Sequence, residues 1–401
     1  MKRREVLKSI ALSGAALSFA DFSKASTPSA PARSFFSIDD NKIRFSHSKI
    51  QKPFSVTFIA DTHLYLDDTR GGLYDVYSKR MSKAYNNTKH FKTGRALNPN
   101  IAFEETLKIA GENKSTLVAL IGDIFSFPSE AAIDWVLEKL RYSAIPYVYT
   151  AGNHDWHYEG MEGSTALLRD TWINKRLLPL YQDRNPLMQK LDLYGVQIIV
   201  IDNSTYEITD EQLDFFRNCM NSKKPSVLML HIPLYVPGRS LGFGCGHPDW
   251  NAKNDKSYQL ERRQPWRGNG HTLTTMEFHK MVFNSKNLMG ILAGHIHNQS
   301  IDIVNGIPQI VADLADKHKS LLKSASSSGH TSHSERFFPD QRPAASAATD
   351  SSFKPSQVDC YVWKSWAFTA TSSSSGHLQR IAFWCHNCNG KSPWISQRSS
   401  A

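Results

Sequence analysis

Short apolar runs rich in β-branched residues alternate with amphipathic stretches along the middle of the chain. Six runs have the length and composition of buried strands, at residues 54–60, 117–122, 147–150, 197–201, 227–230 and 289–292. Four stretches have the apolar spacing of helices, at residues 101–113, 129–142, 209–221 and 274–285. Ser129 is the predicted N-cap of the second helix, and Thr209 or Asp210 that of the third. This alternation predicts a mainly parallel sheet covered by helices.

A predicted hairpin closes this pattern, and two long segments interrupt it. Residues 301–312 predict two short strands around Asn305-Gly306, a pair that suits a type I′ turn. Residues 64–100 and 235–271 are much longer than ordinary connections, and segments of this length are usually functional loops or disordered. We expect both insertions to line or cover a site.

The first 25 residues have the features of an export signal. Arg3 and Arg4 precede an apolar run at residues 10–20, and Ser23 and Ala25 are the small residues that a signal peptidase reads. This order resembles a bacterial twin-arginine signal, rather than a merely basic chain end, and it implies the twin-arginine export machinery as a partner. We expect a periplasmic or extracellular protein. No apolar run is long enough for a stable membrane anchor.

Composition and charge favour a soluble globular protein without a nucleic-acid partner. Hydrophobic residues make up 40% of the chain and charged residues 21%. Most of the net charge of +10 comes from the two ends, which leaves the middle of the chain only mildly basic. A nucleic-acid-binding domain would concentrate positive charge on its own surface. The five cysteines are odd in number and show no disulfide framework.

The last 89 residues differ in kind from the rest. They are rich in serine, with runs at residues 326–328 and 372–375, and their periodicity is poor. We expect a disordered or aberrant tail outside the catalytic fold, which would result from a shifted reading frame. The predicted organisation is a signal peptide at 1–25, a linker or edge segment at 26–53, a catalytic domain at 54–312 and the tail at 313–401.

Side chains with metal-binding chemistry follow five of the predicted strands. They form the motifs Asp61-Thr62-His63, Gly122-Asp123, Gly152-Asn153-His154-Asp155, His231 and Gly294-His295-Ile296-His297. A lone Asp or His at a strand end is more often structural. Open α/β sheets, however, bind ligands beyond the carboxyl ends of their strands, where all five motifs fall. Residues two apart in extended backbone also point to the same side, so Asp61 and His63 can face one ion.

The order of these motifs resembles that of the calcineurin-like metallophosphoesterase family, over about residues 54–312. The resemblance implies a four-layer α/β/β/α sandwich with two central mixed sheets and two divalent metal ions. It implies a first ion held by Asp61, His63, Asp123 and His297. It implies a second ion held by the shared Asp123 with Asn153, His231 and His295. Ligands of this mixed chemistry suit Mn, Fe or Zn, and the sequence leaves the metal open.

The implied activity is hydrolysis of phosphate esters. Two cations about 3.5–4 Å apart neutralise phosphoryl oxygens and convert a shared water into a bridging hydroxide that attacks phosphorus. His154 would remain available to protonate the leaving oxygen, and Asp155 would orient it. Purple acid phosphatases have a tyrosine three residues after the bridging aspartate. Ser126 stands there, so we expect no ferric–tyrosinate centre.

Several alternatives stay open from the sequence. A catalytically silent metal-binding scaffold would lack a ligand or His154, and a nucleic-acid or surface-binding module would need a basic aromatic stripe. Only the second insertion approaches such a stripe, with His247, Trp250, Tyr258, Arg262, Arg263, Trp266 and Arg267. These residues suit either phosphate and base recognition or a solvated loop. The choice between monoester and diester, the natural substrate and the oligomeric state are likewise open.

Overall fold

The computed structural model describes the middle of the chain and one short segment near its end. The described residues are 34–39, 41–84, 97–239, 244–251, 253, 259–260, 264–265, 268–312 and 357–362. The predicted signal peptide at 1–25 lies outside them, as does most of the predicted tail. Within the described residues, no helix is long and apolar enough to cross a membrane.

The first sheet has six strands in the order β1-β2-β14-β3-β4-β5. They are β1 (Phe35–Asp39), β2 (Lys42–Ser46), β14 (Gln357–Val362), β3 (Phe54–Ile59), β4 (Leu117–Ile121) and β5 (Tyr147–Thr150). β14, β3, β4 and β5 run parallel, whereas β1 and β2 pair antiparallel. β1 and β2 come from the predicted linker or edge segment, and β1 forms the edge of this sheet.

Strand β14 corrects the expectation that residues 313–401 lie outside the fold. It is inserted between β2 and β3, with Val358 paired to Phe45 on one side and to Phe54 on the other. Val358 and Cys360 are fully buried. Asp359 on the opposite face receives a hydrogen bond from Nε of Arg44 (2.7 Å). At least this part of the tail therefore belongs to the core of the domain.

The second sheet also has six strands, in the order β12-β13-β11-β8-β7-β6. They are β12 (Ser300–Val304), β13 (Ile307–Val311), β11 (Leu288–Ala293), β8 (Ser226–Met229), β7 (Val196–Ile201) and β6 (Met188–Leu193). The inner four run parallel and the edge strands β12 and β6 antiparallel, so both sheets are mixed as predicted. Asn305 and Gly306, between β12 and β13, both have positive φ, which confirms the predicted type I′ hairpin.

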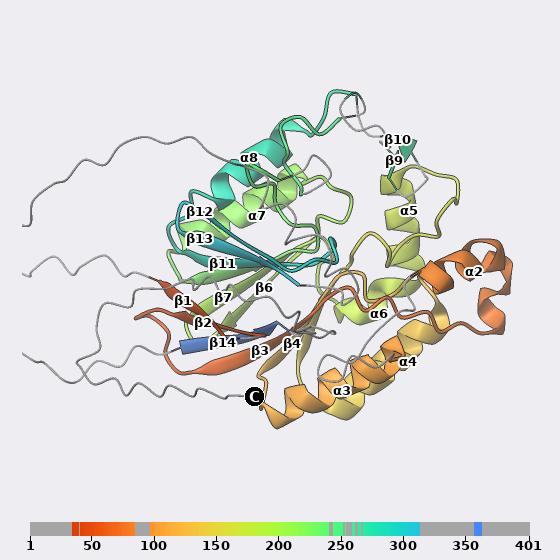
Figure 1. Cartoon of the computed structure of the whole chain (residues 1–401), viewed down its shortest axis with the longest axis horizontal. Helices are drawn as coiled ribbons and strands as arrows, with labels where there is room; N and C mark the ends of the chain where they lie inside the picture. The colour runs from red at the N-terminus through yellow and green to blue at the C-terminus, as the bar shows by residue number, and fades with distance from the viewer. Residues whose placement is uncertain are drawn as a thin grey trace, which may run out of the picture. The chain divides into compact units, whose positions relative to one another are not determined.

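Helices cover the outer face of each sheet, which confirms the predicted four layers (Figure 1). α3 (Pro99–Glu112) and α4 (Glu130–Ser143) lie against the first sheet, and α7 (Asp210–Asn221) and α8 (Leu273–Val282) against the second. Ser129 caps α4 through Ala132 N, and Thr209 caps α7 in a capping box with Gln212. The remaining helical elements are η1 (Thr69–Tyr74), α2 (Asp75–Ala84), α5 (Thr165–Trp172), η2 (Ile173–Leu177) and α6 (Leu178–Tyr181).

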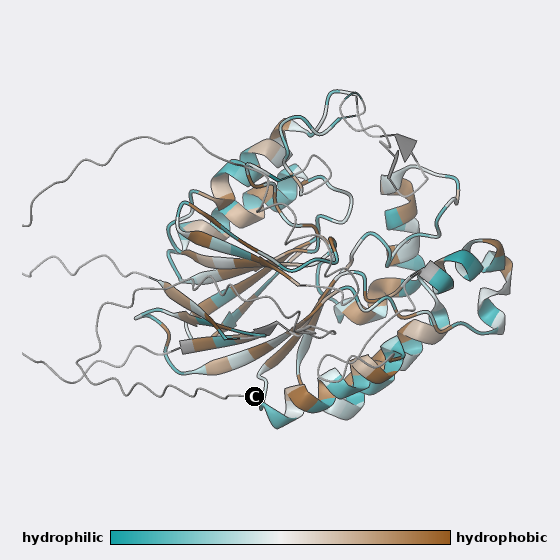
Figure 2. Ribbon diagram, viewed as in Figure 1, coloured by the Kyte–Doolittle hydropathy of each residue, from teal (hydrophilic) through white to brown (hydrophobic). Residues whose placement is uncertain are grey.

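Alternation along the strands divides the apolar core into three layers. Ile198 and Val200 of β7 pack between the two sheets, whereas Ile199 and Ile201 face α7 and α8. The strands are buried on both faces, as parallel strands between two layers must be. Figure 2 shows this pattern as apolar strands inside and polar helix surfaces outside. Because the central strands of each sheet run parallel, their carboxyl ends lie together at one edge, or rim, of that sheet.

Candidate metal centre

The predicted ligands lie on loops that follow parallel strands of both sheets. Asp61 and His63 follow β3, Asp123 follows β4, Asn153 follows β5, His231 follows β8, and His295 and His297 follow β11. Within each sheet, neighbouring loops are tied by backbone hydrogen bonds, from Asp61 N to Gly122 O (3.1 Å) and from Gly294 N to His231 O (2.9 Å). Between the sheets, His295 N donates to Oδ1 of Asp61 (2.9 Å). The rim is therefore one connected site.

Asp61, His63, Asp123 and His297 form the first group of donors. Each offers one ligand atom, and these atoms lie within 4.8 Å of one another. Nε2 of His63 is 3.0 Å from Nε2 of His297 and 3.9 Å from Oδ2 of Asp123. Nε2 of His297 is 3.5 Å from Oδ1 of Asp61. This is the set that the family resemblance implies for one ion.

Asp123, His231 and His295 form the second group, again with ligand atoms within 4.8 Å of one another. Nε2 of His231 lies 3.1 Å from Oδ2 of Asp123. Its Nδ1 lies 3.1 Å from the carbonyl oxygen of Ile121, an acceptor that fixes the orientation of the ring. Asp123 belongs to both groups, as a ligand shared by two ions must. Asn153 is fully buried on the neighbouring loop.

The chemistry of these donors fits divalent cations. Buried imidazole and carboxylate groups converge at 3.0–3.9 Å. Donor atoms that share one cation at about 2.1 Å are separated by about such distances. Two ring nitrogens 3.0 Å apart from each other cannot both act as acceptors without a proton or a cation between them. The two donor groups therefore have the composition and spacing of metal sites.

The ligand residues occupy a backbone conformation that non-glycine residues rarely adopt. Five of the seven predicted ligands have positive φ, namely Asp61 (55°), His63 (48°), Asp123 (50°), His295 (73°) and His297 (51°). Each such residue costs free energy and persists only where its surroundings impose it. The clustering of these residues at one rim is typical of a functional site. Asp61 and His63 are therefore not in the extended backbone that was expected for this motif.

Close packing of the loops leaves no room for a side chain at Gly122. Its φ is 78°, and a Cβ atom there would lie 2.4 Å from Cγ of His231. Glycine allows this conformation without the usual steric penalty. The glycine before Asp123 therefore allows the ligands of the two sheets to approach each other.

Burial and neighbouring charges lower the pKa values of His63 and Asp123 and raise that of His231. Burial and the nearby His154 and His297 hold the pKa of His63 well below its usual range, which favours the neutral, ligating form. Burial alone would lower the pKa of His231, but the Asp123 carboxylate outweighs it and raises this pKa to about 10. Burial alone would raise the pKa of Asp123, yet His231 and His154 hold it well below its usual range. A cation bound by His231 and Asp123 would take the place of this proton.

His154 lies beside the first donor group without belonging to either group. Its ring centroid is 4.9 Å from that of His63, in an edge-to-face arrangement. Its backbone N–H donates to Oδ1 of Asp123 (2.8 Å), which ties the loop after β5 to the shared ligand. Its imidazole thus lies next to the first donor group.

Asp155 contacts the backbone of two site loops. Its carboxylate accepts hydrogen bonds from Phe125 N (2.7 Å) and Gly152 N (2.8 Å). Burial and the charge of Asp123 raise the pKa of Asp155 to about 8. The carboxylate therefore holds the loops after β4 and β5 together. Its expected orientation of the His154 ring stays a prediction.

Two residues of the loop after β7 contact the site and were not predicted. The side chain of Asn203 is bonded to both backbone groups of Ile232, next to His231 (2.6 and 3.0 Å). The hydroxyl of Tyr206 lies 3.0 Å from Nε2 of His295. Both follow the end of a predicted strand, so the rule that identified the other motifs could have included this loop.

The described parts of the insertions pack onto the domain. Arg70 of η1 forms an ion pair with Asp134 of α4 (2.8 Å). Trp250 is buried against Tyr206, with ring centroids 5.0 Å apart. His247 is buried too. The other polar and aromatic residues of the second insertion, Tyr258, Arg262, Arg263, Trp266 and Arg267, lie outside the described residues.

Ser126, which stands where purple acid phosphatases have a tyrosine, is fully buried. Its hydroxyl donates to the carbonyl oxygen of His63 (2.9 Å). It therefore supports the backbone of a ligand.

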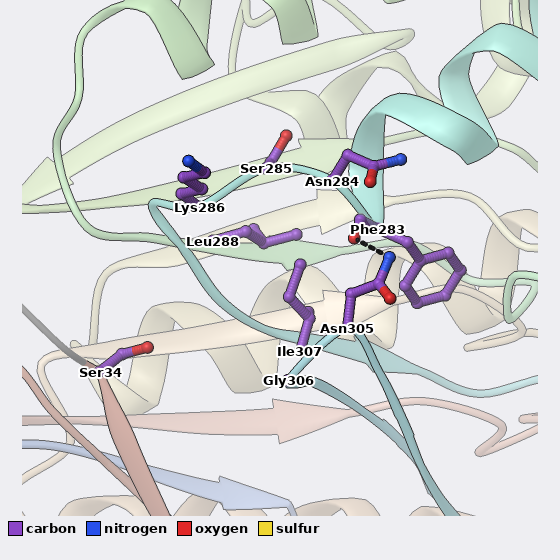
Figure 3. A pocket seen from close by; sticks show the side chains of 9 residues that line it. All are labelled: Ser34, Phe283, Asn284, Ser285, Lys286, Leu288, Asn305, Gly306 and Ile307. Carbon is purple, nitrogen blue, oxygen red and sulfur yellow. Dashed lines mark hydrogen bonds between the residues drawn. The ribbon is translucent and has the colours of Figure 1, made fainter.

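A cavity of about 450 Å³ lies at the opposite end of the strands (Figure 3). It is bordered by Leu288 and Ile307, where β11 and β13 begin, and by Asn305, whose Nδ2 donates to Phe283 O (3.0 Å). It shares no residue with the predicted site. The donor groups, not this cavity, carry the chemistry that the sequence predicts.

Comparisons with known proteins agree with this geometry. A family model described as calcineurin-like phosphoesterase matches residues 54–299. A dimetal phosphatase from Danio rerio resembles 64% of this chain over 86% of its own, with a TM-score of 0.40 and 10% identity. A purple acid phosphatase from yellow lupin (Lupinus luteus) resembles 67% of this chain over 49% of its own, with a TM-score of 0.37 and 14% identity. At these identities the likeness concerns the fold alone. No curated protein matches the sequence.

Proposed function

Because the chain belongs to the calcineurin-like phosphoesterase family, we propose that it hydrolyses phosphate esters with a pair of divalent cations. The observation that carries this proposal is the pair of donor groups that share Asp123. A single metal site would need only one of them. A catalytically silent relative would have lost a ligand or His154, and all of these residues are present at the rim.

The chain's own residues would divide the work of the reaction. When bound, two cations neutralise the phosphoryl oxygens and lower the pKa of a water molecule. Asp123 would bind both cations and so link the two donor groups, and the neutral His63 would bind one cation through a ring nitrogen. His154, beside His63, donates a proton to the leaving oxygen. Asp155 keeps the loops of Asp123 and His154 at a fixed separation through its two backbone hydrogen bonds.

Turnover by metal-loaded protein tests this function directly. We expect the purified protein to hydrolyse model phosphate esters, to lose activity on treatment with a chelator, and to regain it with Mn²⁺ or Zn²⁺. Asp123→Asn and His154→Ala should each lower kcat by about 100-fold or more, because they remove the shared ligand and the proton donor. A panel of monoesters and diesters assayed in parallel identifies the preferred class.

Matched controls separate a loss of chemistry from a loss of fold. Asp192→Asn removes an exposed carboxylate that pairs with Lys224, and His47→Ala removes a histidine in the loop before β3. Both should retain wild-type turnover. Wild-type turnover that a chelator leaves unchanged would count against the proposal, as would full activity in Asp123→Asn.

The export of the protein is a separate part of the proposal. It is supported by the order of Arg3-Arg4, the apolar run at 10–20 and the small residues Ser23 and Ala25. The twin-arginine route carries folded proteins, which suits an enzyme that binds its metals before export. Detection of the chain in a periplasmic fraction, and its retention in the cytoplasm after Arg3→Lys with Arg4→Lys, tests this point.

A further inference from the structure

The hydroxyl of Tyr206 reaches the metal centre from a loop that carries none of the family motifs. It lies 3.0 Å from Nε2 of His295, and the two ring centroids are 5.4 Å apart at a steep angle. Tyr206 belongs to the segment between β7 and α7, whereas His295 follows β11. The contact therefore joins the loops after β7 and β11, two strands of the second sheet that are separated by β8.

Tyr206 is held in place by several independent contacts. Its φ is 65°, a conformation that a bulky residue adopts only under constraint. Its N–H donates to Asn203 O (2.8 Å), and its carbonyl oxygen accepts from Sγ of Cys245 (3.2 Å). Its ring packs edge-to-face on Trp250, and only 7% of the residue is exposed. Together these contacts hold the Tyr206 hydroxyl beside His295.

We propose that Tyr206 is a positioning residue for the cation group of Asp123, His231 and His295. Because its hydroxyl contacts Nε2 of His295, a cation would have to bind this ring through Nδ1. The hydroxyl accepts the Nε2–H of the neutral imidazole and thereby fixes the tautomer that presents Nδ1 to the cation. This inference rests on the proposed function, in that the group binds a cation.

His231 in the same group shows the same arrangement with the nitrogens exchanged. Its Nδ1 faces the carbonyl oxygen of Ile121, and its Nε2 faces Asp123. Each histidine of the group thus has one nitrogen in contact with a partner outside the group, which is Ile121 O for His231 and the Tyr206 hydroxyl for His295. Outer partners of this kind contribute about 10- to 100-fold to metal affinity or activity. The partner of His231 is a backbone carbonyl, whereas the contact of His295 comes from a side chain that a substitution can remove.

Tyr206→Phe tests the role of the hydroxyl with little change of volume. Metal-stripped protein is titrated with Mn²⁺ in a calorimeter. We expect two binding events in the wild type, of which one becomes about 10-fold weaker or more in Tyr206→Phe while the other is unchanged. Tyr74→Phe is the control, because it removes a hydroxyl that bonds Lys175 on the surface (2.8 Å). It should leave both events unchanged.

Nuclear magnetic resonance of ¹⁵N-histidine-labelled, metal-free protein gives a readout independent of metal and turnover. The wild type should show His295 as the Nε2–H tautomer with a slowly exchanging ring proton, identified by its loss in His295→Gln. In Tyr206→Phe this proton should exchange faster. An unchanged tautomer and exchange rate, or equal weakening of both Mn²⁺ events, would overturn the inference. A wild type that binds no Mn²⁺ would instead overturn the proposed function, while the tautomer measurement would still decide the role of Tyr206.

Discussion

At the scale of single residues, the site depends on positions that tolerate no added atoms. A Cβ atom on Gly294 would lie 2.4 Å from Oδ2 of Asp61 and 2.8 Å from Cβ of Ala60. Gly294 does not have a positive φ, so its backbone conformation is also open to alanine. The cost of an alanine there comes from its Cβ atom, which would collide with Asp61 and Ala60. The carboxylate of Asp61 would have to move away from the first donor group.

We therefore expect Gly294→Ala to weaken metal binding while the protein stays folded. The Mn²⁺ affinity of one site and kcat should each fall by about 10-fold or more, since small displacements of reacting groups are costly. Metal titration and steady-state kinetics measure these effects. Gly111→Ala is the matched control, because nothing lies within 4 Å of an added Cβ in α3. Equal metal affinity in the two variants would contradict this account.

The candidate ligand residues could be identified from the sequence because each stands at the end of a predicted strand. Asp61-x-His63 and His295-x-His297 can be recognised without knowing where the strands meet. The strand-end rule could have pointed to the loop of Tyr206, but not to its contact with His295, which joins residues 89 positions apart. The positive φ values of the ligands were also invisible, since tertiary contacts impose them on residues that do not favour them.

At the scale of elements, side chains that clamp loops decide how the strand ends meet. Asn203, which follows β7, donates from Nδ2 to Ile232 O and accepts from Ile232 N at Oδ1. Ile232 is the neighbour of the candidate ligand His231, and both are fully buried. The loop after β8 is therefore held by the loop after β7.

Replacement of Asn203 by alanine should destabilise the protein and disturb this loop. It leaves a buried N–H and a buried C=O without their partner, and each such group costs about 1–3 kcal/mol. We expect the free energy of unfolding to fall by about 2 kcal/mol or more in urea titrations. Asn174→Ala, which removes an exposed amide bonded to Asp170, should change it by less than about 0.5 kcal/mol. Similar values for the two variants would show that the clamp is unimportant.

Element positions followed from the sequence wherever the signal was local. The predicted strand at 147–150 matches β5, and the caps Ser129 and Thr209 begin α4 and α7 as expected. The other predicted strands agree with the observed ones to within about two residues. Periodicity and capping act through neighbouring residues, so one sequence is enough to reveal them. The pairing order of the strands depends on distant contacts and was not predicted; the family resemblance implied only the four layers and the two mixed sheets.

At the scale of the whole molecule, strand β14 closes the first sheet from the far end of the chain. Its six residues stand in a serine-rich region, and its partners β2 and β3 lie about 300 positions earlier. Nothing local marks such a pairing. Without β14, the facing backbone groups of β2 and β3 would lack a strand between them, and unpaired buried backbone groups are costly. The domain is therefore completed by a segment that the sequence pattern placed outside it.

A charge at Val358 distinguishes a core strand from a loose tail. Val358 is fully buried between the sheets, so Val358→Asp would bury a carboxylate with no cation beside it. We expect the free energy of unfolding to fall by about 3 kcal/mol or more, together with lower solubility, because burial of an uncompensated polar group has at least this cost. Asp359→Asn, on the solvent side of the same strand, removes ion pairs with Lys42 and Arg44 that are partly exposed. It should cost less than about 1 kcal/mol. Urea unfolding of the full-length chain measures both free energies. If both variants lost less than about 1 kcal/mol, β14 would not be a core strand between β2 and β3.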